Sequence, residues 1–302
     1  MIYLNSFRLP TTAEEEFFFT PPPLNPNFKM KNFRTVYETK YPFHLFDFRE
    51  LPELTFKDIT VFCGNNGSGK STVLNVISEK LHLPRSTPYN RSDFFDDYTE
   101  LCSFKLSGDI SEDSCIITSD DVFDRVLDIR RINLGIDNRK SELIQEFISE
   151  RNNARESSNH LAGIDDYDRW KKAADMRNKH TTQSQYIRSN LKRNIRECSN
   201  GESALSYFID QIADGGLYLL DEPENSLSPS NQLQLKFFIE DCVRNHNCQF
   251  ILSTHSPFLL SLKYAKIYDL DAVPVESVRS WTELACVKAY YDFFREHMEE
   301  FH

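Results

Sequence analysis

The sequence predicts an α/β protein with a largely parallel β-sheet, because a strand–loop–helix pattern recurs along it. Residues 59–63 have the length and composition of a buried strand, a glycine-rich turn follows, and apolar residues recur at helical spacing over 71–81. Two further apolar runs, 216–220 and 249–253, flank a helix that we expect to begin at Ser228-Pro229. Buried strands that alternate with helices are typical of parallel sheets.

Composition and charge exclude several classes of protein. The chain has 302 residues, of which 40% are hydrophobic, and a formal net charge of −11. The apolar content excludes a disordered chain, and the negative charge argues against a protein that coats DNA. No run of about 18 apolar residues occurs, and because an acidic cluster stands near the start of the sequence, we expect no secretion signal. The seven cysteines are odd in number and form no C-x-x-C pair, so we expect reduced thiols and a cytoplasmic protein.

Residues 125–196 differ in character from the rest and predict a helical insertion. They carry 16 basic and 10 acidic residues, a net charge of +6, which leaves −17 for the remainder. Nine basic residues and one acid fall within 169–196. This stretch is either a contact for the phosphate backbone of DNA or RNA or a solvated helix face. The insertion has about 70 residues, so we expect it to form only short helices.

At the C-terminal end of the chain, a capping box at Ser280-x-x-Glu283 predicts a docked helix.

The strongest motif in the chain is a phosphate-binding loop. Residues 64–71 read G-N-N-G-S-G-K-S, which fits G-x-x-x-x-G-K-[ST] between a predicted strand and a predicted helix. Glycines let successive backbone N–H groups face the phosphates, and the helix N-terminus adds positive potential. Lys70 is expected to reach the β- and γ-phosphates of a nucleotide, and the Ser71 hydroxyl to bind Mg²⁺.

Two carboxylates follow the second buried strand. Residues 217–220 are apolar, and Asp221 and Glu222 come directly after them, where strand ends meet ligands in parallel sheets. Asp221 suits a Mg²⁺ ion, whereas Glu222 suits the orientation and deprotonation of a water molecule. Taken alone, an Asp-Glu pair at a strand end also serves as a helix cap.

Two shorter motifs complete the pattern. Ser199-Asn-Gly-Glu202 reads as a capping box, and the free N–H groups of such a helix start suit the γ-phosphate of a nucleotide bound by another subunit. Ser253-Thr-His255-Ser-Pro follows the third apolar run, so we expect His255 at the same sheet edge as Asp221. A lone histidine in such a place is more often structural, but the neighbouring motifs favour a functional role.

In this order, the motifs resemble those of the ATP-binding-cassette ATPases. The motifs D-E-P-E-N-S-L-S-P and S-T-H-S-P are similar to those of the soluble branch of chromosome-maintenance and break-repair ATPases. They are also similar to those of small bacterial AAA-family ATPases of anti-phage defence modules. The resemblance implies an ABC-type P-loop NTPase fold. It assigns the signature motif to Ser199, Gly201 and Glu202, the catalytic base to Glu222, a dimer-contacting loop to Ser226–Ser228, and the γ-phosphate switch to His255.

These motifs define the expected site. We predict Lys70, Glu222 and His255 as catalytic residues, and Ser71 and Asp221 as ligands of Mg²⁺. The residues expected to bind ATP are Gly64, Asn65, Asn66, Gly67, Ser68, Gly69, Lys70, Ser71, Thr72, Ser199, Gly201 and Glu202. The chain departs from the family at Asn200, where a second glycine is usual, and at Asp120 and Asp121, where a glutamine is expected. Either aspartate is a candidate for binding Mg²⁺ or water, and capping of the next helix is an equal alternative.

The predicted domain order follows from the motifs. Residues 1–124 form a nucleotide-binding lobe with the phosphate loop, 125–196 a basic helical insertion, and 197–302 the signature and switch part of the same nucleotide-binding domain. The predicted function is an ATP-hydrolysing homodimeric switch that controls a separate effector protein in a nucleic-acid-directed or anti-phage defence complex. A repair-type ATPase that binds DNA directly is the alternative, and a transporter ATPase subunit is a weaker one.

Overall fold

The computed structural model of the chain describes residues 2–21, 24–25, 39–47, 49, 51, 53–156 and 200–301. The chain divides into two compact units. The first consists of Met1–Phe123 and Ser199–His302, and the second is Asp124–Cys198. The predicted strands and phosphate loop lie in the first unit, and the predicted basic segment 169–196 lies outside the described residues.

A six-stranded sheet forms the centre of the first unit, and its order is β5-β6-β7-β3-β8-β9. Every pair from β5 to β8 is parallel, and β9 runs antiparallel to β8. The prediction of an α/β fold with a largely parallel sheet is therefore confirmed. The strands are β3 (Ile59–Cys63), β5 (Cys115–Thr118), β6 (Leu217–Asp221), β7 (Gln249–Ser253), β8 (Lys266–Asp269) and β9 (Glu276–Val278).

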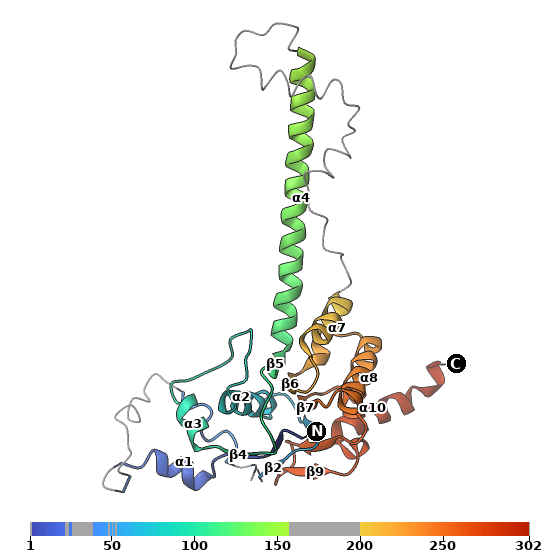
Figure 1. The fold of residues 1–302 in the computed structure, drawn as a ribbon. Helices are drawn as coiled ribbons and strands as arrows, with labels where there is room; N and C mark the ends of the chain where they lie inside the picture. The colour runs from blue at the N-terminus through green and yellow to red at the C-terminus, as the bar shows by residue number, and fades with distance from the viewer. Residues whose placement is uncertain are drawn as a thin grey trace. The chain divides into compact units, whose positions relative to one another are not determined.

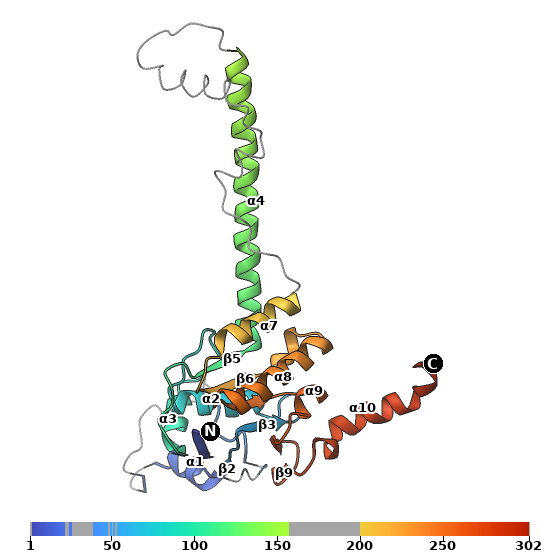
Figure 2. The ribbon, with the colours of Figure 1, turned by 45° about the vertical axis from the view of Figure 1, so that its right-hand side comes forward.

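Both faces of this sheet are buried, which explains why its strands are continuous apolar runs. On one face, Phe62 and Leu219 pack with α2 (Lys70–Lys80) in a cluster that includes Leu74. On the other face, Val61 and Leu220 pack against three helices. These helices are α7 (Asn200–Gln211), α8 (Pro229–Asn245) and α9 (Pro257–Leu260) (Figure 2).

A small antiparallel sheet lies against the α2 side of the core. Its order is β2-β1-β4, formed by Leu54–Thr55, Leu4–Arg8 and Ser103–Leu106, with α1 (Thr12–Phe18) and α3 (Phe95–Leu101) beside it. The buried Gln249 side chain joins the two sheets: its Oε1 accepts from the Tyr3 and Leu4 amides at 2.8 and 2.9 Å, and its Nε2 donates to the Leu4 carbonyl at 3.0 Å.

The helix that leads into the second unit is longer than expected. α4 runs over Ser119–Glu156, a single helix of 38 residues, so the expectation of only short helices was wrong. Its sequence contains no proline and one glycine, Gly135, and so offers few breaks. On its surface Arg139 pairs with Glu142 at 2.8 Å and with Glu146 at 3.2 Å. No helix among the described residues has the length and apolar character needed to cross a membrane.

The C-terminal helix is docked only at its start. Ser280 caps a 3-10 turn, η4 (Trp281–Glu283), and Leu284 is extended before α10 (Ala285–Glu296) and the 3-10 turn η5 (Met298–Phe301) begin. Leu284 and Val287 are buried, but the later apolar side chains of this part of the chain are exposed, because it extends beyond the core (Figures 1 and 2). The expected docking of the C-terminal helix is therefore met only at its start. The exposed side chains are Tyr291, Phe294 and Met298.

Candidate functional site: the edge of the parallel sheet

The phosphate loop connects β3 to α2 and is shaped by close packing. Gly69 has φ +94°, in the left-handed region that favours glycine. A Cβ atom there would lie 2.6 Å from Cε1 of Phe46, so the ring leaves no room for a side chain. On the other side of the loop, the Asn65 amide donates to Asp271 Oδ2 at 2.8 Å, and Arg49 donates to the Ser68 carbonyl. The loop conformation is therefore held from two directions.

Lys70 is the first residue of α2, and its amine lies at the mouth of this loop. Nζ donates to the carbonyls of Gly64 at 2.9 Å and Asn65 at 3.3 Å, and it lies 3.5 Å from Glu222 Oε1. The side chain is almost fully buried, with 3% of its surface exposed. A buried ammonium group needs such partners, and phosphate oxygens are stronger ones.

Ser71 and Asp221 bring two oxygen atoms together. The Ser71 hydroxyl donates to Asp221 Oδ1 at 3.0 Å, and the Ser253 hydroxyl donates to the same oxygen at 2.5 Å. Burial raises the pKa of Asp221, against these two hydrogen bonds. Adjacent oxygen ligands of an octahedral Mg²⁺ ion are about 2.9 Å apart. The hydroxyl and the carboxylate therefore fit a Mg²⁺ ion in spacing and in chemistry.

Glu222 is held in a defined orientation. Its backbone is left-handed, with φ 47°, and its amide donates to the carbonyl and the hydroxyl of Ser253. The side-chain Nδ2 of Asn225 donates to Glu222 Oε2 at 3.0 Å. Burial raises the pKa of Glu222, but Asn225, Lys70 and His255 lower it by more, so the pKa lies below its ordinary value. Glu222 is consequently an ionised carboxylate at neutral pH.

His255 lies beside Glu222, as the strand-end position predicts. Its Nε2 is 3.3 Å from Glu222 Oε1, and about a third of the side chain is exposed. The turn that carries it is fixed by Glu224, whose Oε1 accepts from the His255 amide at 2.5 Å and from the Ser256 amide at 3.2 Å. Burial raises the pKa of Glu224. Sequence reasoning missed the positioning contacts of Glu224 and Asn225, although both belong to the D-E-P-E-N motif.

The two aspartates that follow β5 have different environments. Asp121 Oδ2 accepts from the Thr118 amide at 2.7 Å and from its hydroxyl at 2.9 Å, which is the reciprocal cap of α4. Asp120 lines a cavity of about 580 Å³ together with Ser71, Asp221 and Arg85. Of the two candidates for binding Mg²⁺ or water, Asp120 is therefore the one that faces the site.

The structure describes only part of the predicted signature motif. Ser199 lies outside the described residues, α7 begins at Asn200 and includes Gly201, and the side chain of Glu202 is not among those described. The expected dimer-contacting loop is described: Leu227 is buried, and the Ser228 hydroxyl caps α8 by accepting from the Asn231 amide at 3.3 Å.

Comparison with known proteins identifies the family. Residues 78–261 match the family described as "AAA domain, putative AbiEii toxin, Type IV TA system", which is more than half of the chain. The chain belongs to this family. The match begins within α2, after the phosphate loop, and ends just beyond α9, so it contains Asp221, Glu222 and His255. No curated protein sequence matches the chain.

Solved structures with a similar fold include heads of chromosome-maintenance proteins and ABC cassettes. The Smc head domain of Pyrococcus furiosus, solved with the C-terminal domain of ScpA, has 14% identity and a TM-score of 0.41, and the match covers 97% of this chain and 100% of that one. For the SMC head domain of Thermotoga maritima these values are 14%, 0.36, 76% and 95%. For the dimeric ATP-binding cassette MJ0796 bound to ADP and Pi they are 17%, 0.33, 76% and 89%.

Proposed function

We propose that this protein is an ATP-binding and ATP-hydrolysing switch that acts as a homodimer. The observation that carries the proposal is the convergence of five side chains from three segments at one edge of the parallel sheet. Ser71 contacts Asp221 at 3.0 Å, and Glu222 lies 3.5 Å from Lys70 and 3.3 Å from His255. A cation, two oxygen ligands, an ionised carboxylate and an imidazole are what in-line hydrolysis of a phosphoanhydride requires.

Each group has a distinct part in the proposed reaction. The loop amides of 64–72 and the Lys70 amine bind the β- and γ-phosphates, and Ser71 with Asp221 holds Mg²⁺, which neutralises phosphate charge when bound. Glu222 accepts a hydrogen bond from the attacking water and takes its proton as the water oxygen bonds to the γ-phosphorus. The bond from that phosphorus to the bridging oxygen breaks, and ADP leaves. In this proposal His255 donates to the γ-phosphate, and its contact with Glu222 holds the two side chains together.

We infer that a second copy of the chain completes the site. The N–H groups at the start of α7, beside Ser199, Gly201 and Glu202, suit an anion. In the proposal this anion is the γ-phosphate of a nucleotide bound by the other subunit. In this arrangement ATP joins the phosphate loop of one subunit to the signature residues of its partner, and Ser226–Ser228 lies at the contact. Hydrolysis then opens the dimer.

The proposed biological role is control of a separate effector protein by this switch in the cytoplasm, within an anti-phage or nucleic-acid-directed complex. The family description supports this role because it names a toxin and a toxin–antitoxin system. The second candidate, direct binding of DNA or RNA, is favoured by the basic composition of 169–196. In both versions residues 1–124 and 197–302 form the nucleotide-binding domain and 125–196 the basic insertion.

Purification of the tagged protein from its host distinguishes the two roles. A Glu222→Gln variant with ATP and Mg²⁺ holds the closed state, and a Lys70→Ala variant serves as the matched open control. A protein that copurifies only with Glu222→Gln, and survives nuclease treatment, supports effector control. Recovery of nucleic acid alone supports the second candidate, and ordinary ATP turnover by Glu222→Gln contradicts the assigned chemistry.

A further inference from the structure

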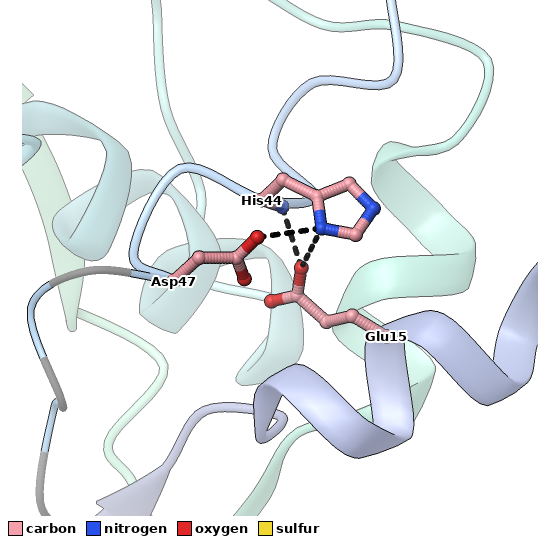
Figure 3. A group of neighbouring side chains, drawn as sticks. All are labelled: Glu15, His44 and Asp47. Atoms are coloured by element: carbon pink, nitrogen blue, oxygen red, sulfur yellow. Dashed lines mark hydrogen bonds and ion pairs between the residues drawn. The ribbon is translucent and has the colours of Figure 1, made fainter.

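Figure 3 shows a second group of neighbouring polar side chains, none of which belongs to the nucleotide site described above. Glu15 belongs to α1, whereas His44 and Asp47 belong to the turn that precedes β2. Nδ1 of His44 is 2.8 Å from Asp47 Oδ2 and 3.7 Å from Glu15 Oε2. One ligand atom from each of the three residues lies within 4.8 Å of the other two. Figure 3 shows both carboxylates directed at the same ring nitrogen.

The charge of this cluster is not balanced by its own members. The Glu15 side chain is 2% exposed and the Asp47 side chain 20%. Two carboxylates beside one imidazole leave a net negative charge even when His44 is protonated. The backbone N–H of His44 donates a hydrogen bond of 2.5 Å to Glu15 Oε2. A divalent cation would balance the two carboxylates and leave His44 neutral.

One further atom at the cluster lacks a partner. Asp47 Oδ1 is buried and has no hydrogen-bond partner among the described residues. The hydroxyl of the fully buried Tyr98 interacts with the Glu15 carboxylate. Buried polar atoms are nearly always satisfied, so the unpartnered Asp47 oxygen points to a missing group beside it.

We propose that Glu15, His44 and Asp47 bind one divalent transition-metal ion. Ligands of a four-coordinate zinc-class ion stand about 3.4 Å apart, and the two distances from His44 Nδ1, 2.8 and 3.7 Å, bracket this value. One imidazole and two carboxylates suit such an ion, whereas Mg²⁺ and Ca²⁺ prefer oxygen ligands alone. The Tyr98 hydroxyl is then the hydrogen-bond partner of a bound carboxylate or of a water on the ion.

The position of this site connects it to the phosphate loop. Phe46 lies between two of the ligands in sequence, and its ring packs on Gly69. In the same turn, the Tyr41 hydroxyl is hydrogen-bonded to Thr72 at 2.9 Å. An ion bound by Glu15, His44 and Asp47 ties α1 to the turn that covers the phosphate loop, and so it stabilises this part of the first unit.

A surface group that also consists of one histidine and two carboxylates provides a matched control. His246 Nδ1 is 2.8 Å from Asp214 Oδ1, and its Nε2 is 3.7 Å from Asp241 Oδ2. Because the two carboxylates approach different ring nitrogens, they do not converge on one ion. His246→Gln therefore removes a histidine flanked by two aspartates without removing the proposed site.

The test is the binding of Co²⁺ to the nucleotide-free full chain, measured by visible absorption and by equilibrium dialysis. Co²⁺ reports its ligands, since thiolate coordination by cysteine adds a charge-transfer band that nitrogen and oxygen ligands lack. We expect one ion per chain without that band, displaced by Zn²⁺, in the parent, in His246→Gln and in Asp221→Asn. Asp47→Asn and His44→Gln should each weaken binding by at least about tenfold.

Thermal unfolding keeps the test decisive if one variant folds poorly. Because ligand that binds only the folded state raises stability, Zn²⁺ should raise the Tm of the parent and of His246→Gln but not that of His44→Gln, whose side chain is a third exposed. Absence of a bound ion in the parent, a thiolate spectrum, or binding by Asp47→Asn and His44→Gln as tight as that of the parent would overturn the proposal. A bound ion that is lost only in Asp221→Asn would overturn it too.

Discussion

The two halves of the proposed ATP site differ in how the chain builds them. The half within one chain stands on three neighbouring strands, and the registers of β6 with β7 and β7 with β3 place Asp221 opposite Ser253 and Ser253 opposite Phe62. The other half rests on the start of a single helix, α7, directly after Ser199. The sheet therefore fixes the chemistry within one subunit, and we infer that completion of the site is left to association.

The largest expected effect lies in the first half. Lys70→Ala should weaken ATP binding by at least about a hundredfold, because it removes charge-assisted hydrogen bonds from a buried position. Isothermal titration with ATP measures the loss. Lys80→Ala, at the other end of α2, is the matched control and should bind like the parent. Equal affinity in both variants would remove Lys70 from the phosphate site.

Glu222→Gln should separate binding from turnover. The amide keeps the size of the side chain but accepts no proton, so we expect hydrolysis to fall by about 10²- to 10⁴-fold with ATP affinity within a few-fold of the parent. Phosphate release and titration measure the two quantities. Light scattering with ATP and Mg²⁺ should show this variant as a trapped dimer. Turnover at the parent rate would contradict its role as the base.

The second half is tested through association. Ser199→Arg introduces a long side chain at the proposed contact, so it should remove ATP-dependent dimerisation and leave ATP binding by monomers nearly unchanged. Mixing sharpens the comparison between the halves. A Lys70→Ala subunit and a Ser199→Arg subunit together retain one intact composite site, and some activity should return. Complete lack of activity in the mixture would count against a site shared between subunits.

A smaller effect is expected from the contact that orients Glu222. The Asn225 amide stabilises the ionised carboxylate and so helps to hold the pKa of Glu222 below its ordinary value. Asn225→Ala should raise this pKa and move the acid limb of the turnover profile to higher pH, with the rate at neutral pH changed by less than about tenfold. An unchanged acid limb would mean that another group limits turnover at low pH.

The smallest effect on ATP chemistry is expected from the basic segment. Reversal of Lys171, Lys172, Arg188, Lys192 and Arg193 to glutamate should leave ATP affinity unchanged, but it should weaken DNA or RNA binding and flatten its salt dependence. Filter binding at several salt concentrations measures this. Reversal of five basic residues of α4 (Arg125, Arg130, Arg131, Arg139 and Lys140) is the matched control. Parent-like nucleic-acid binding after the first reversal would favour protein docking or a solvated face.

Local sequence signals determined the parallel sheet and the identity of the residues at its edge. The buried run 59–63, the loop 64–71 and the Ser228-Pro229 cap each contain their own signal within a few residues, and the structure has a strand, a loop and a helix start there. Local signals failed where the context decides. A helix pattern does not show whether α10 has a surface to pack on, and the length of the segment, about 70 residues, does not exclude a helix as long as α4.

Contacts between distant residues were decided by the tertiary structure alone. Gln249 is hydrogen-bonded to Leu4, 245 positions away, and Glu15 to the backbone of His44, 29 positions away. No sequence motif predicts either contact. The same holds for Cys63 and Cys286, whose Sγ atoms lie 3.5 Å apart. The physical reason is that burial and hydrogen bonding act between whichever surfaces the fold brings together, whereas a motif records only the requirements of neighbouring residues.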